Sequence, residues 1–207
     1  MNYDFIYFMG DSYTWAMKQD DDINREINRQ NRFSGLIGKH YNLPILNKAL
    51  PGCSNFHIFK TVYDDIYKFV SQGKKILVVL SYTSPTRVDL FHNGRNKYQP
   101  ISDLFSFYKE YVVESFNTNY CDDLSTQYIL AIHTLLDKFN IDYVESYVWD
   151  PLLDVPYANK NRCLDKSLLE ITQPEGRFNP TGHANILGNA RIAEEFIKKI
   201  DQLYGTN

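Results

Sequence analysis

The sequence is poor in cysteine and has no long apolar run. Its three cysteines, Cys53, Cys121 and Cys163, are widely separated and odd in number, which matches neither a disulfide framework nor a zinc site and favours a reducing compartment. No apolar segment approaches the roughly 20 residues of a membrane helix, and the run near the first residue is too short for the core of a signal peptide. We therefore expect a cytoplasmic protein with no membrane partner.

An excess of charge of either sign is also absent. The chain carries 22 Lys and Arg against 25 Asp and Glu, and its formal net charge is −3. This balance argues against a nucleic-acid partner, because proteins that bind nucleic acid carry a basic surface. The acidic run at 20–22 lacks spaced carboxylate partners, so we expect neither a metal site nor a cofactor.

Segments typical of strands and helices alternate along the 207 residues, a length that fits one domain. Apolar, β-favouring runs predict strands at 3–8, 43–46, 75–80 and 141–148. Apolar residues at helical spacing predict helices at 32–41, at 55–73 with Asn55 as N-cap, at 102–116, from 122 or 123 to 139, and at 186–203. This order is typical of an α/β protein with a doubly wound parallel sheet between helices.

The remaining stretches are interpreted as connections. The aliphatic run at 75–80 predicts a central strand that is covered on both faces. The segment 92–100 predicts a polar loop, and 149–179 predicts a long surface connection with a short helix near 164–169. Open α/β sheets bind their ligands at the carboxyl ends of the strands, so we expect the functional residues in these loops.

Three short motifs stand at such positions. The sequence Gly-Asp-Ser at 10–12 follows the first strand, Gly52 follows the second, and Gly-His at 182–183 opens the last helix. A serine hydroxyl becomes a nucleophile only when a positioned base takes its proton. We therefore expect Ser12 to be the nucleophile and His183 its base, with His92 a distant second. The alternative is a set of ordinary turn residues, since Gly, Asp and Ser are frequent in turns.

In order, spacing and position, these motifs resemble the blocks of the SGNH hydrolases, also called GDSL hydrolases, over nearly the whole chain. The resemblance implies one SGNH-hydrolase-like domain at 1–207, a flavodoxin-like three-layer α/β/α sandwich. It also implies a catalytic pair of Ser12 and His183. An oxyanion hole would include the backbone N–H groups of Ser12 and Gly52.

Two residues of the family pattern are missing. The family places an Asn side chain after its third strand as a further oxyanion donor, and this chain has Thr83 there, whose hydroxyl could donate instead. The Asp that usually precedes the base is absent too, so Asn179, Thr181 or a main-chain carbonyl would have to orient His183. A dyad of this kind would be weaker than a triad.

Neighbouring residues are assigned to substrate binding. These residues, which adjoin the ends of the first and third strands, are Asp11, Tyr82 and Arg87. Two alternatives stay open for Arg87: it could add positive charge near the oxyanion, or it could bind a surface carboxylate. The 16 Tyr and 13 Phe are expected mostly in the core, with some lining a carbohydrate or peptide groove.

These residues together predict a serine esterase. Its substrate is expected to be a small acyl ester, with an O-acetyl group on a carbohydrate as the leading interpretation. Acyl transfer to a sugar is a related alternative, because an alcohol can resolve the same acyl-enzyme as water. A catalytically decayed binding or structural protein is a second alternative, supported by the missing Asn and Asp.

Overall fold

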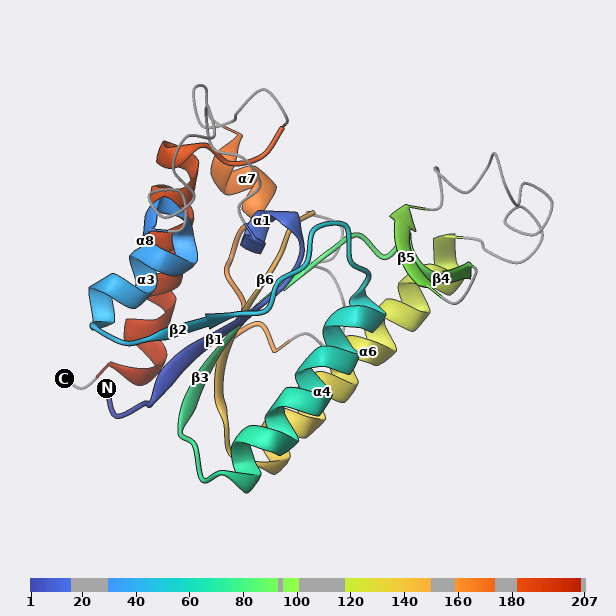
Figure 1. Cartoon of the computed structure of the whole chain (residues 1–207). Helices are drawn as coiled ribbons and strands as arrows, with labels where there is room; N and C mark the ends of the chain where they lie inside the picture. Colours follow the sequence, from blue (N-terminus) through green and yellow to red (C-terminus); the bar gives the residue numbers. More distant parts are fainter. Residues whose placement is uncertain (16–29, 93–94, 101–117, 150–158, 174–181, 206–207) are drawn as a thin grey trace.

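The computed structural model describes residues 1–15, 30–92, 95–100, 118–149, 159–173 and 182–205 (Figure 1). In this part of the chain four parallel strands form a sheet in the order β2-β1-β3-β6. The strands are β1 (Phe5–Met9), β2 (Ile45–Asn47), β3 (Ile76–Tyr82) and β6 (Asp142–Tyr147). The prediction of a central strand at 75–80 is confirmed, because β3 lies between β1 and β6.

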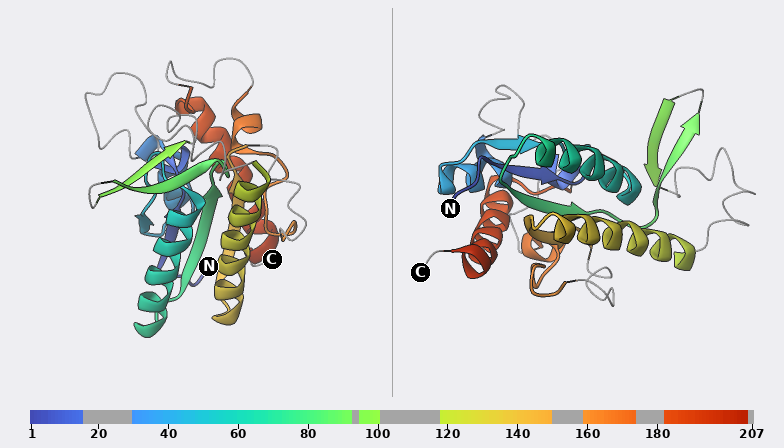
Figure 2. Two further views of the ribbon diagram at one scale, coloured as in Figure 1. Left: turned by 90° about the vertical axis from the view of Figure 1, so that its right-hand side faces the viewer. Right: turned by 90° about the horizontal axis from the view of Figure 1, so that it is seen from below.

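Two layers of helices enclose the sheet (Figures 1 and 2). One layer consists of α3 (Phe33–Tyr41) and α8 (Ile186–Tyr204), and the other consists of α4 (Asn55–Ser71) and α6 (Thr118–Lys138). Alternate residues of each strand enter the two cores, as the two-residue period of a strand requires. The predicted three-layer α/β/α sandwich is therefore confirmed.

The alternation is clear in β1. Ile6 and Phe8 are buried in the core under α3 and α8, whereas Tyr7 and Met9 are buried in the core under α4 and α6. In the described part of the chain no helix is both long and apolar enough to cross a membrane.

Two predictions about local structure are wrong. The segment after β3 forms an antiparallel hairpin of β4 (Arg87–His92) and β5 (Arg95–Pro100), not a polar loop. The N-cap of α4 is Ser54, whose side chain accepts a hydrogen bond from the backbone N–H of His57 at 3.1 Å, and not Asn55. Both Ser and Asn favour the N-cap position, so the sequence alone could not choose between neighbours.

Two short helices complete the described fold. They are α1 (Ser12–Trp15), directly after β1, and α7 (Leu168–Thr172), which begins a few residues later than predicted. The helix expected at 102–116 and most of the connection expected at 149–179 lie outside the described residues.

The strand order fixes where a site can form. From β1 the chain crosses to β2 on one side of the sheet, whereas from β3 it leads to β6 on the other side. The carboxyl ends of β1 and β3 therefore meet at a topological switch point, the usual ligand position in doubly wound folds. Ser12 follows β1 and Thr83 follows β3 at this point.

Candidate active site

Ser12 and His183 meet at the switch point. Oγ of Ser12 lies 2.9 Å from Nε2 of His183, a hydrogen-bond distance. Ser12 begins α1 and is 5% exposed. His183 stands just before α8, whose N-cap is Asn185. The two residues come from opposite ends of the chain, and the fold brings them together as an acyl-transfer mechanism requires.

The turn between β1 and Ser12 depends on the absence of a side chain at Gly10. A Cβ atom there would overlap Oγ1 of Thr14 and lie 2.9 Å from the carbonyl oxygen of Ser81. Glycine is therefore needed because β3 and α1 approach the backbone closely. Gly10 does not have a positive φ, so this close approach, and not a left-handed backbone, is what requires glycine.

Asp11 is completely buried beside the serine. Its carboxylate accepts hydrogen bonds from the backbone N–H of Tyr13 at 2.9 Å, from the hydroxyl of Thr83 at 2.9 Å and from Nη1 of Arg87 at 2.7 Å. Both of its oxygens are thus engaged inside the protein. The expectation that Asp11 binds substrate directly is wrong, because the carboxylate holds together β1, β3 and the start of β4.

Thr83 is fixed by two neighbours. Its hydroxyl donates to Asp11, and its backbone N–H and carbonyl pair with the side chain of Asn55 at 2.9 and 3.0 Å. A hydroxyl has one proton to donate, so in this arrangement Thr83 cannot also donate to an oxyanion. The role of Asn55 was not predicted from the sequence. The available signal was its position just after Gly52 and Ser54, in the segment that leads from β2 into α4.

Gly52 is one of the two residues whose backbone N–H group is predicted to donate to the oxyanion. Its φ of 75° lies in the left-handed region, which glycine adopts without strain. The segment around it is tied to the end of β1 by the backbone N–H groups of Lys48 and Leu50, which donate to the carbonyls of Phe8 and Gly10. No described residue accepts a hydrogen bond from the backbone N–H of Ser12 or Gly52. Their part in an oxyanion hole stays a prediction.

Tyr13 contacts the loop that carries the histidine. Its hydroxyl donates to the carbonyl of Gly182 at 3.1 Å, and its ring lies 5.4 Å from the ring of His183. Burial, with a smaller contribution from the charge of Asp11, raises the pKa of Tyr13 to about 12, so the hydroxyl remains a donor at neutral pH. The sequence gave no role to Tyr13. Asn179 and Thr181, the predicted partners of His183, lie outside the described residues.

Of the other predicted site residues, the fold places Arg87 at the site and Tyr82 in the core. The side chain of Arg87 is 18% exposed and reaches Asp11, so it lies at the site. Tyr82 is 0% exposed and belongs to the core under α4 and α6, so its assignment to substrate binding is wrong. Successive residues of β3 face opposite sides of the sheet, which separates Tyr82 from Thr83. The side chain of His92 lies outside the described residues.

A second polar cluster surrounds Tyr82 on the side of the sheet that α4 and α6 cover. Nε2 of His133 lies 2.5 Å from Oε2 of Glu145, and the rings of Tyr82 and Tyr143 pack against His133. Burial first, and then the charge of Glu145, raises the pKa of Tyr82 well above its usual value. The cluster could have been recognised from the sequence by the two-residue spacing of Tyr143, Glu145 and Tyr147. In a strand this spacing places all three side chains on one face of the sheet. The cluster is enclosed in the core and separate from Ser12.

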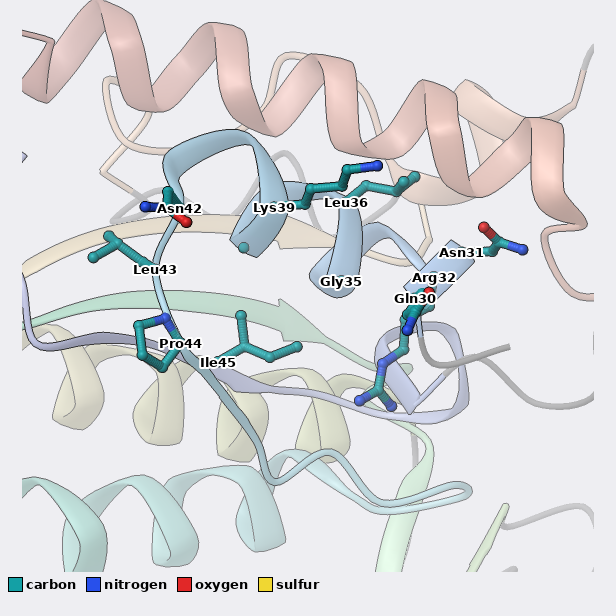
Figure 3. Close-up of a pocket in the computed structure, with 11 residues that line it drawn as sticks. Gln30, Asn31, Arg32, Gly35, Leu36, Lys39, Asn42, Leu43, Pro44 and Ile45 are labelled. Atoms are coloured by element: carbon teal, nitrogen blue, oxygen red, sulfur yellow. The ribbon is translucent and has the colours of Figure 1, made fainter. Parts of the chain in front are cut away.

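A groove of about 790 Å³ runs along α3 and the start of β2 (Figure 3). Its lining includes Arg32, Lys39 and Pro44 but neither Ser12 nor His183. It is therefore distinct from the serine site, and nothing in its lining provides a nucleophile and a base together.

Comparison with known proteins gives the class to which this fold belongs. No family model and no curated protein sequence matches the chain. Solved structures match it over nearly its whole length. TesA is 11% identical with a TM-score of 0.62, covering 96% of this chain and 99% of TesA.

Two further structures agree. The acetyl xylan esterase Est2A from Butyrivibrio proteoclasticus is 13% identical with a TM-score of 0.63, covering 99% of this chain and 66% of Est2A. A member of the lipolytic G-D-S-L family from Veillonella parvula is 12% identical with a TM-score of 0.52, covering 93% and 96% of the two chains. The chain therefore has the fold of the SGNH, or GDSL, hydrolases, as its motifs predicted.

Proposed function

We propose that this protein is a serine esterase that removes small acyl groups, with O-acetyl groups on a carbohydrate as its substrate class. The distance of 2.9 Å between Oγ of Ser12 and Nε2 of His183 carries the proposal. The fold supports it, because the matching structures include GDSL lipolytic proteins and esterases. The remaining requirements are a proton path and a site for the oxyanion.

The reaction follows the geometry of the pair. Oγ of Ser12 attacks the carbonyl carbon of the ester while Nε2 of His183 takes the hydroxyl proton, and the electron pair of the carbonyl moves to its oxygen. The backbone N–H groups of Ser12 and Gly52 donate to that oxyanion. When the tetrahedral intermediate collapses, the alcohol leaves with the proton from His183. Water then attacks the carbonyl carbon of the acyl-serine and gives up a proton to Nε2 of His183. When the second tetrahedral intermediate collapses, the bond between the acyl carbon and Oγ breaks, Oγ of Ser12 takes the proton back from His183, and the acid is released.

Exposed aromatic residues support a carbohydrate substrate. The chain has two tryptophans, and both are exposed: Trp15 ends α1 and Trp149 follows β6. Both therefore lie beyond the carboxyl ends of strands of the sheet, β1 and β6, which is the end where Ser12 lies. Indole rings offer a flat apolar face together with a polar N–H group, which suits the faces of sugar rings. One matching structure is an acetyl xylan esterase, which agrees with this substrate class.

Acetate release tests the proposal. Wild-type protein is expected to release acetate from acetylated xylo-oligosaccharides and from p-nitrophenyl acetate, and not to hydrolyse p-nitrophenyl palmitate. Ser12→Ala should release none, and Trp15→Ala should raise KM for the oligosaccharide while leaving KM for p-nitrophenyl acetate unchanged. Absence of acetate release by folded wild-type protein would favour the alternative of a binding protein with a hydrolase fold.

A further inference from the structure

We propose that Arg87 is a catalytic residue that donates a hydrogen bond to the oxyanion, in place of the Asn side chain that this chain lacks. The inference rests on the proposed esterase function and extends it. It concerns the third donor of the oxyanion hole, for which Thr83 was the expected residue.

Arg87 has hydrogen-bond donors to spare, whereas Thr83 does not. Thr83 gives its one hydroxyl proton to Oδ2 of Asp11, and both N–H donors considered so far belong to the backbone. The guanidinium of Arg87 has five N–H donors, and one nitrogen, Nη1, contacts Asp11. Within the described part of the chain, no residue other than Asp11 accepts a hydrogen bond from the side chain of Arg87. Donors on this side chain therefore remain for a substrate oxygen.

The guanidinium of Arg87 also lies next to Thr83. Nη1 of Arg87 and Oγ1 of Thr83 contact the same oxygen of Asp11, so the guanidinium lies beside the hydroxyl that stands where the family has its Asn. A turn at 84–87 brings the arginine back to this point, closed by the backbone N–H of Arg87 donating to the carbonyl of Ser84 at 3.1 Å. Proline at its second position favours such a turn. The side chain of Arg87 is 18% exposed, whereas that of Asp11 is 1% exposed. A substrate can therefore reach the arginine.

The negative charge of Asp11 makes a cation necessary at this site. Asp11 is a buried carboxylate directly adjacent to Ser12 in the chain, and an oxyanion that forms on the serine adduct would be repelled by its negative charge. The effect is large at a site with little water. The guanidinium of Arg87 is a cation, so its ion pair with Asp11 offsets the negative charge of that carboxylate. A charge-assisted hydrogen bond from the guanidinium would be stronger than one from a neutral hydroxyl.

The alternative is that Arg87 only neutralises Asp11 and holds the loop. Replacing the ester carbonyl oxygen by sulfur separates the two roles, because a thiocarbonyl accepts hydrogen bonds poorly. The experiment measures kcat and KM of wild type, Arg87→Met and Arg87→Lys with p-nitrophenyl acetate and with its thiono analogue. Arg87→Lys keeps a positive charge beside Asp11, so it provides a folded variant if Arg87→Met unfolds. Arg191→Met, which alters a surface ion pair on α8, is the matched control.

We expect Arg87→Met to lower kcat for p-nitrophenyl acetate by ~100-fold or more, the usual loss of an oxyanion donor, with KM nearly unchanged. The loss with the thiono ester should be at least ~10-fold smaller. Arg87→Lys should show the same pattern with a smaller loss, because it lacks the planar fork. Equal losses with both esters, or wild-type kcat in the Arg87 variants, would overturn this inference alone. Wild-type turnover that persists in Ser12→Ala would overturn the proposed function as well.

Discussion

Oγ of Ser12 and Nε2 of His183 lie 2.9 Å apart although 171 residues separate them in the chain. The chain before α8 returns to the carboxyl end of β1, and this return brings the two residues into contact. The alternative of ordinary turn residues gives no reason for the two motifs to meet. A nucleophile and its base must lie within hydrogen-bond reach, and this pair does.

We predict that His183→Ala lowers kcat for p-nitrophenyl acetate by ~100-fold or more, because no other described side chain is placed to take the proton of Ser12. His40→Ala is the matched control, since His40 is an exposed histidine on α3. Steady-state kinetics of both variants check this. A His183→Ala protein with wild-type kcat would exclude the pair.

We predict that Tyr13→Phe lowers kcat about tenfold, because it removes the hydrogen bond to the carbonyl of Gly182 and leaves the loop of His183 less firmly held. KM should stay within about twofold, and the free energy of unfolding should fall by about 1 kcal/mol, the typical value of one hydrogen bond. Tyr63→Phe, which alters an exposed ring on α4, is the control. Unchanged kcat in Tyr13→Phe would show that the phenol hydroxyl does not position the base.

We predict that Thr83→Val destabilises the protein by about 1–3 kcal/mol, because it removes a donor from the buried carboxylate of Asp11. Thr83→Ser keeps the hydroxyl and should lose less. Urea unfolding measures both values. If Thr83→Val is as stable as wild type, the hydrogen bond to Asp11 contributes nothing to the fold. A large loss of kcat at unchanged stability would restore Thr83 as the oxyanion donor.

We predict that stability falls as the pH rises from about 10 to 12. Burial raises the pKa of Tyr13 and Tyr143 to about 12, whereas an unfolded tyrosine ionises near ~10. Between these values the folded chain binds more protons than the unfolded chain, so the free energy of unfolding decreases with pH. Urea midpoints at pH 9 and 11 measure the difference. A midpoint that is equal at both pH values would show that these phenols are not shielded from water.

Much of the fold was predictable because it rests on periodicity. The aliphatic run of β3 and the apolar stripes of the helices follow directly from the sequence. So do the positions of Ser12, after a strand, and of His183, before a helix. The partners inside the site were not predictable in the same way. Thr83 donates to a carboxylate 72 residues away, and which hydroxyl proton is engaged depends on three-dimensional contacts.

The errors have similar physical causes. Tyr82 ends β3, a strand buried on both faces, and Thr83 follows it directly. No alternation of polar and apolar residues in β3 indicates which of the two turns toward the site. The hairpin of β4 and β5 was missed because its polar residues resemble those of a loop. Arg87 was placed correctly near the site, but its ion pair with Asp11 became evident only from the structure.

Labelling with a fluorophosphonate tests the central claim most directly, because the reagent reacts with a serine only when a base activates it. Wild-type protein should take up one equivalent, and peptide mapping should find the adduct on Ser12. Ser12→Ala should take up none, whereas Ser71→Ala, which removes an exposed hydroxyl at the end of α4, should label like wild type. Folded wild-type protein that stays unlabelled, or an adduct on another residue, would contradict the account.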